Sequence, residues 1–138
     1  MAYPAACVFD SFAVLAYLND ERGSDLVSEL LERASRKQIA LSMHVINLGE
    51  VYYAVHRKVG QARADLVYAT VRAYPVSFVD ELGEELLLKA ARIKALYPLA
   101  YADAFAAATA MSLRATLVSG DPEFDALSHQ KLLAILWK

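Results

Sequence analysis

The stretch over residues 98–112, PLAYADAFAAATAMS, most constrains the fold, because it predicts a nearly apolar helix that carries a single carboxylate, Asp103. The side chains that share its helical face are mostly alanine: Leu99, Ala100, Ala106, Ala107 and Ala110. An ionised group in a low-dielectric site costs several kcal/mol unless it is paired, hydrogen-bonded or bound to a metal ion. No Lys or Arg lies within one turn of Asp103, so its partner must come from elsewhere in the chain.

Short apolar runs alternate with helical patterns along the rest of the chain. Strands are expected at residues 5–9, 38–41, 76–79, 116–119 and 133–136. Helices are expected at residues 12–19, from 24 onward, and at 42–59, 61–73, 81–96 and 98–112, with a turn at 120–123. This alternation predicts an α/β domain with a mostly parallel sheet of four to five strands, covered by helices on both faces.

Composition limits the class of protein. The 138 residues are enough for one domain, expected to span residues 1–138. A 57% apolar content and a mean hydropathy of +0.29 exceed what one small core needs, so we expect a homodimer, a higher homo-oligomer or a dedicated partner. The net charge of -2 argues against tight non-specific nucleic-acid binding. The single Cys7 excludes an internal disulfide. Residues 1–9 lack a basic leader and no apolar run reaches the roughly 18 residues of a membrane span, so a cytoplasmic protein without membrane contact is expected.

Four carboxylates are expected at one edge of this sheet. Asp10 follows the first predicted strand and Asp121 the fourth, while Asp103 and a half-buried Glu50 lie in helices that can cross the same edge. Two carboxylates about 4 Å apart repel by roughly 4 kcal/mol at an effective dielectric near 20. Four acids gathered there need a divalent cation, and oxygen ligands favour Mg²⁺ or Mn²⁺.

Each polar residue also has an ordinary structural interpretation. Asp10 is equally a helix cap or turn residue, Asp121 sits in common Gly-Asp-Pro turn chemistry, and Glu50 could extend to water from a helix edge. The histidines lack metal-ligand spacing and read as cap, surface and turn residues: His44, His56 and His129. The basic groups read as solvated helix faces, of which the second could touch a phosphate backbone: Arg33/Arg36/Lys37, Arg57/Lys58/Arg63 and Lys89/Arg92/Lys94. Taken together, the four acids outweigh these interpretations.

The acids also stand in four motifs, which occur in order along nearly the whole chain. These are Val8-Phe-Asp10-Ser11, Asn47-Leu-Gly-Glu50-Val-Tyr-Tyr, Tyr101-Ala-Asp103-Ala-Phe and Leu117-Val-Ser-Gly-Asp121-Pro-Glu-Phe124. In this the chain resembles the PIN-domain nucleases, and within them the VapC-like toxins of type II toxin-antitoxin pairs. The resemblance implies a three-layer α/β/α fold and an endoribonuclease with an acidic metal site of Asp10, Glu50, Asp103 and Asp121. The resemblance does not include Asp125 among the metal-binding acids. Three further residues look like polar residues that assist at the site: Ser11, Asn47 and Ser119.

No Ser/His or Cys/His pair lies near the acids, so the expected nucleophile is a metal-activated water that hydrolyses an RNA phosphodiester. The resemblance implies products with 5′-phosphate and 3′-hydroxyl ends. The RNA target cannot be read, because no aromatic residues interleave with the basic groups as they do in base-stacking modules.

Two other classes remain open. A haloacid-dehalogenase-like phosphatase also places an acid after its first strand and a Gly-Asp turn later, which the stretch from Gly120 to Asp125 imitates. That class needs a second Asp two residues after the first, where this chain has Phe12. A non-catalytic protein-binding module would suit the apolar surface but leaves Asp103 unexplained.

The stretch FAVLAYL over residues 12–18 is apolar on every side, which predicts that a further element covers it. We expect an amphipathic segment of a cognate antitoxin to dock there. Its site should lie between this helix and the apolar face of the next one, formed by Leu48, Val51, Tyr52 and Val55. Self-association is the competing use of the same surface.

Overall fold

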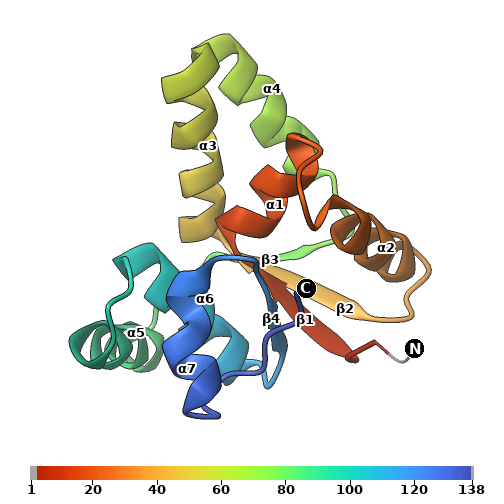
Figure 1. Cartoon of the computed structure of the whole chain (residues 1–138). Coiled ribbons are helices and arrows are strands. Elements are labelled where there is room, and N and C mark those ends of the chain that lie inside the picture. The colour runs from red at the N-terminus through yellow and green to blue at the C-terminus, as the bar shows by residue number, and fades with distance from the viewer. Residues whose placement is uncertain (1–2, 138) are drawn as a thin grey trace.

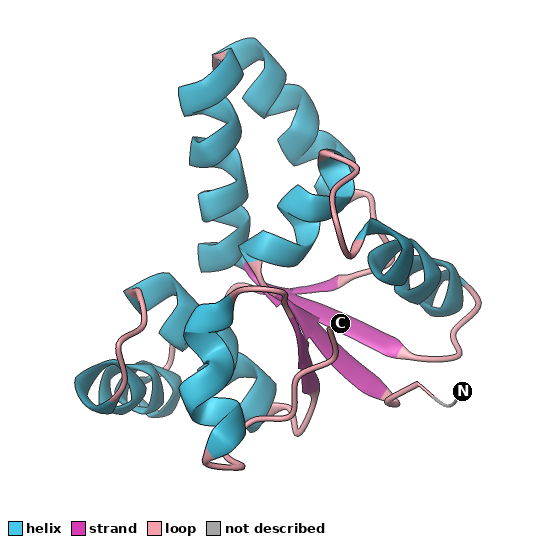
Figure 2. Cartoon of the chain, viewed as in Figure 1, coloured by secondary structure: helices cyan, strands magenta, loops and turns pink. Residues whose placement is uncertain are grey.

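A computed structural model describes residues 3–137 (Figure 1). Four strands form one sheet: β1 (Ala6–Phe9), β2 (Ala40–His44), β3 (Ser77–Val79) and β4 (Thr116–Val118). Their order is β3-β2-β1-β4, and every neighbouring pair is parallel (Figure 2). β1 is central, and Cys7 pairs with Leu41 on one side and with Thr116 on the other.

Helices cover both faces of the sheet. One layer holds α1 (Ser11–Leu18), α2 (Ser24–Ser35), α3 (Val45–Val59) and α4 (Gln61–Arg72). The other holds α5 (Glu84–Leu96), α6 (Tyr101–Ser112) and α7 (Asp125–His129), with a 3₁₀ turn, η1 (Pro122–Phe124), before α7. Alternation along β1 separates two apolar clusters: Cys7 and Phe9 pack with the first layer and Val8 with the second. The expected α/β/α architecture is confirmed.

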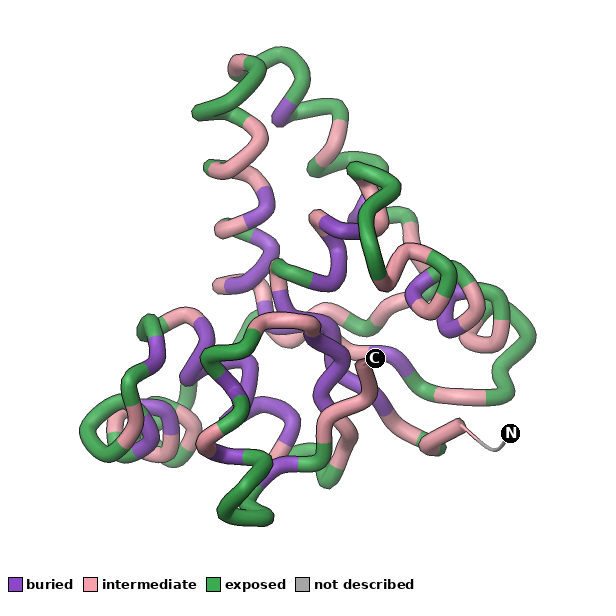
Figure 3. The backbone as a smooth tube through the Cα atoms, in the orientation of Figure 1, coloured by how far each residue is buried: buried purple, intermediate pink, exposed green. Residues whose placement is uncertain are grey.

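α6 is packed between the sheet and α5, as its alanine-rich sequence predicts. Every residue from Asp103 to Ala110 is buried (Figure 3). Small side chains allow the helix to approach β1, β2 and β4 closely. The helix begins at Tyr101 rather than at residue 98, because Ala100 has extended backbone angles and precedes the first turn.

Several predicted boundaries are wrong. Residues 42–44 extend β2 instead of opening α3, because Ser42 pairs with both Val8 and Ser77 and the sheet overrides the helical pattern. Asp10 caps α1, one of the interpretations that its position allowed, and its carboxylate accepts from the Ala13 N–H. The strand expected at residues 133–136 is reduced to one parallel bridge between Leu117 and Ile135.

α3 and α4 form a hairpin that projects away from the sheet (Figure 1). Gly60 joins them at φ +98°, a value that suits glycine and permits the sharp reversal. α1 packs against the lower half of α3, so these two helices begin together at the sheet and separate above it. Among residues 3–137, no helix has the length and apolar character needed to cross a membrane.

Candidate metal centre

Asp10 lies at the carboxyl end of the central strand and is fully buried. Its Oδ1 accepts from Ala13 N at 2.8 Å, whereas Oδ2 has no hydrogen-bond partner among the described residues. Burial raises the pKa of Asp10 to about 7, against the opposing effects of the Ser119 hydroxyl and the Ala13 N–H. The buried and unpartnered oxygen is therefore available to a cation.

Glu50 is half-buried in the second turn of α3, as expected. Its Oε1 accepts from Ser11 Oγ at 2.9 Å and from Asn47 Nδ2 at 3.3 Å. The same Asn47 amide donates to Ala102 O at 3.0 Å, which ties α3 to the first turn of α6. Ser11 and Asn47 thus hold one oxygen of Glu50 in place.

Asp121 follows β4 and caps η1. Its backbone N–H donates to Ser119 Oγ at 3.0 Å, and its Oδ1 accepts from Glu123 N at 3.0 Å. Carboxylate oxygens of Asp103, Asp121 and Glu123 all lie within 4.8 Å of one another. This distance is compatible with a shared cation, and every donor in the group is an oxygen.

Burial raises the pKa of Asp103 to about 8, helped by a hydrogen bond with Glu123 and by the charges of Glu50, Asp121 and Asp10. These charge effects place all four expected acids in one electrostatic neighbourhood. Burial, rather than the repulsion expected from the sequence, is the largest cause of the raised pKa of both Asp10 and Asp103.

No Lys or Arg balances these carboxylates within residues 3–137. The two ion pairs found in that range, Arg33 with Glu29 and Arg36 with Glu32, both lie along α2. Buried carboxylates are unfavourable in the ionised state when no cation pairs with them. These carboxyl groups must therefore bind protons or a metal ion. Oxygen donors and an unpartnered Asp10 Oδ2 fit a hard divalent cation.

The sequence analysis missed Glu123. The signal in the sequence was Asp121-Pro122, a pair that often starts a helical turn. Such a turn places Glu123 close to Asp121. Asp125 opens α7, and its carboxylate is not one of the three that lie within 4.8 Å of one another. His44 is a cap: its Nδ1 accepts from Ile46 N at 3.1 Å.

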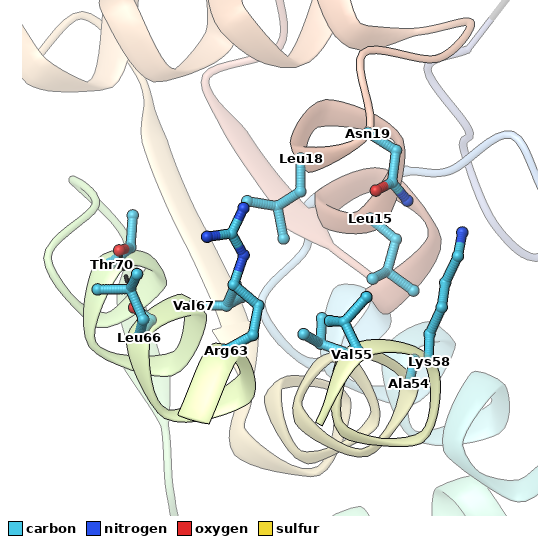
Figure 4. Close-up of a pocket in the computed structure, with 11 residues that line it drawn as sticks. Leu15, Leu18, Asn19, Ala54, Val55, Lys58, Arg63, Leu66, Val67 and Thr70 are labelled. Carbon is cyan, nitrogen blue, oxygen red and sulfur yellow. Dashed lines mark hydrogen bonds between the residues drawn. The ribbon is translucent and has the colours of Figure 1, made fainter. Parts of the chain in front are cut away.

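A second feature lies apart from the acids. An apolar pocket of about 440 Å³ opens between α1, α3 and α4, and the acids do not line it. Figure 4 shows Leu15 and Leu18 of α1 near Val55 of α3 and Val67 of α4, with Lys58 and Arg63 extending towards α1. The docking face expected on residues 48–55 is therefore wrong for most of its members. Leu48 and Val51 are buried in the core, and of the four expected residues only Val55 lines the pocket.

A family model described as PIN domain matches residues 7–130. Among solved structures, the chain is similar to VapBC2 from Rickettsia felis, described as bound to a DNA fragment from its promoter. The identity is 15% and the TM-score 0.75, over 95% of this chain and 97% of that chain.

It is also similar to VapBC-1 from nontypeable Haemophilus influenzae, at 18% identity and a TM-score of 0.69 over 96% of this chain and 97% of that one. A third similar structure is Mycobacterium tuberculosis VapC20, described as a Sarcin-Ricin loop cleaving toxin. It is 16% identical with a TM-score of 0.66, over 88% of this chain and 93% of that one. At such identities the likeness is one of fold. No curated protein sequence matches the chain.

Proposed function

The chain belongs to the PIN-domain family, and from this premise we propose that it is a metal-dependent endoribonuclease, the toxin of a toxin-antitoxin pair. The observation that carries the proposal is the group of carboxylates near the ends of β1 and β4, in which Asp10 and Asp103 are buried, without an ion-pair partner among residues 3–137. The similarity to VapC20, described as cleaving the Sarcin-Ricin loop, supports RNA as the substrate.

Asp10, Glu50, Asp103 and Asp121 would hold the cation, Mg²⁺ or Mn²⁺, with Glu123 as a further ligand. When bound, such an ion activates water and stabilises negative charge on a phosphate. Asp10 and Asp103 must release their protons first, since burial keeps the pKa of each at or above neutrality. Ser11 and Asn47 orient Glu50, and Ser119 fixes the backbone that carries Asp121.

The outer face of α3 supports an RNA strand as the substrate. Glu50, Tyr53 and Arg57 follow one another at helical spacing, and Tyr53 is 50% exposed. The Arg57 guanidinium lies 5.3 Å from the centre of the Tyr53 ring. An exposed ring can stack on a base and an arginine can bind a phosphate, so this face offers a track that leads to the acids. The sequence shows no aromatic residues interleaved with the basic groups, and the Tyr53–Arg57 contact is visible only in the structure.

The partner would be a cognate antitoxin whose amphipathic segment fills the α1/α3/α4 pocket. The pocket combines apolar walls with two cations, Lys58 and Arg63, which suits an apolar helix that carries acidic residues. One similar structure is described as a toxin-antitoxin complex from Klebsiella pneumoniae. We further propose that residues 1–138 act as one domain, that the protein forms homodimers or higher homo-oligomers, and that it works in the cytoplasm.

The test is to incubate the purified chain with RNA and, separately, with p-nitrophenyl phosphate, each with Mg²⁺, Mn²⁺ or EDTA. RNA cleavage that requires the metal supports the proposal. Turnover of the phosphomonoester without RNA cleavage would favour the haloacid-dehalogenase-like alternative. Activity on neither substrate would leave a binding module as the better description.

A further inference from the structure

Trp137 lies at the same edge of the sheet as the acids. Leu117 N donates to Ala134 O at 2.9 Å and Leu136 N donates to Leu117 O at 2.8 Å. Residues 134–136 therefore run parallel to β4, towards the end of the sheet where Asp121 lies. Trp137 follows directly and is half-buried there.

The indole is held by three separate segments. Phe12, at the start of α1, meets it edge to face, with ring centres 5.8 Å apart. A Cβ added at Gly23, in the loop before α2, would overlap the six-membered ring of the indole. A Cβ added at Gly120 would overlap the indole nitrogen and also approach Phe12. Both glycines leave the space that the indole fills.

Two of these segments carry the acidic centre. Gly120 stands between Ser119 and Asp121, and Phe12 directly follows Ser11, which donates to Glu50. The indole therefore bridges the backbone of the Asp121 loop and the start of α1. Displacement of the indole would let these segments move relative to each other, and the carboxylates with them.

We propose that Trp137 is a positioning residue of the metal centre, which fixes the distance between the Asp10 and Asp121 segments without contacting the ion. The inference rests on the proposed function for the metal alone, not for RNA. Trp137 is also the chain's one tryptophan, so its fluorescence reports on this position directly.

The test is a titration of the full-length protein with Mg²⁺, followed by tryptophan fluorescence and by calorimetry. Wild-type fluorescence should change saturably, and Asp103→Asn should abolish that change. Trp137→Ala should weaken Mg²⁺ binding about 10-fold or more, the scale on which groups that orient metal ligands act. Trp137→Phe should recover most of the affinity. Gly120→Ala keeps the indole but fills the space that it occupies. This variant should weaken Mg²⁺ binding and shift the tryptophan emission.

Tyr74→Ala is the matched control, because Tyr74 packs against the same apolar cluster as Trp137 and pairs edge to face with Tyr17. It should lower the urea midpoint as Trp137→Ala does, yet leave Mg²⁺ affinity unchanged. Unchanged affinity in both Trp137→Ala and Gly120→Ala, or an equal loss in Tyr74→Ala, would overturn the inference. A wild-type protein that binds no Mg²⁺ at all would instead overturn the proposed function, and this inference with it.

Discussion

The two ends of the α1 and α3 pair differ in what they leave unsatisfied. Near the sheet, Asp10 is buried at the N-cap of α1 and Glu50 is half-buried in the second turn of α3, and neither has an ion-pair partner among residues 3–137. Further along, Leu15 and Val55 line an open apolar pocket with Lys58 at its edge. The end of the pair near the sheet therefore offers a site for a cation, and the far end offers a site for an apolar segment of another molecule.

Binding at these two sites depends on different interactions. Binding at the acidic end must respond to pH and to divalent ions, because protons and metal compete for the same oxygens. Binding in the pocket is chiefly a matter of apolar area and is far less sensitive to pH. Changes confined to one end should therefore leave the other end's function intact, and this separation can be measured.

The largest expected effect follows removal of charge at the acidic end. Asp103→Asn should lower RNA cleavage by roughly 10²- to 10³-fold, the scale for loss of one group that stabilises a charged transition state. The fold should remain, and above about pH 8, where Asp103 is ionised, the metal-free protein should gain stability because one repelling carboxylate is gone. Cleavage assays with Mg²⁺ and thermal melts with EDTA check both halves. Full activity in Asp103→Asn would contradict the assignment, whereas binding of the partner should be unaffected.

The converse change is made in the pocket. Leu66→Glu places a charge on a pocket-lining side chain that is 58% exposed, so folding should tolerate it. Partner affinity should fall by about 2–3 kcal/mol, roughly 30- to 150-fold, with cleavage unchanged. Leu96→Glu, on α5 and outside the pocket, is the control, since Leu96 is 77% exposed. Equal affinities for the two variants, measured by calorimetry, would mean that the partner docks elsewhere.

A third experiment uses pH and metal together. In the folded state the pKa of Asp10 is raised to about 7 and that of Asp103 to about 8. Both carboxyls thus bind protons more tightly when folded than when unfolded, where their pKa is near 4. Their contribution to stability is complete below about pH 4 and is lost as the pH rises through 7 and 8.

The melting temperature with EDTA should therefore fall from pH 5 to pH 8. Mn²⁺ at a hundred times its dissociation constant should restore about 2.7 kcal/mol at pH 8, and the same concentration should restore less at pH 5, where protons compete. An equal shift at both pH values, or none at either, would show that the acids are not one metal site. The affinity of the pocket should not follow this trend.

The smallest effect concerns Glu123, which is exposed where Asp103 is buried. Glu123→Gln should raise the Mn²⁺ concentration for half-maximal cleavage by about 10-fold, while the maximal rate changes little. Asp125→Asn, two residues on, should change neither quantity. If Glu123→Gln matched Asp103→Asn in rate, Glu123 would be a principal ligand and not an auxiliary one.

The sequence was informative wherever local pattern and tertiary environment agree. Alternating strands and helices predicted the layers, and an acid within alanines predicted burial at Asp103. The pattern failed where distant partners decide. Ser42 looks helical but joins a strand pair, and Glu123 reaches the acids only through the turn that Asp121 caps. The position of Trp137 near the acids could not be predicted from the sequence, because its neighbours Gly23 and Gly120 come from two loops that are distant in the chain.

The central place of β1 in the sheet has a consequence for how the protein forms. Cys7 pairs with Leu41 and with Thr116, so β1 gains its second neighbour only after β4, the last of the four described strands in chain order, has been synthesised. Closing so long a loop costs conformational entropy, and pairing between distant segments slows folding. Asp121 joins Asp10 only at that step. A growing chain without β4 therefore lacks Asp121, and the four carboxylates come together only after that strand has paired.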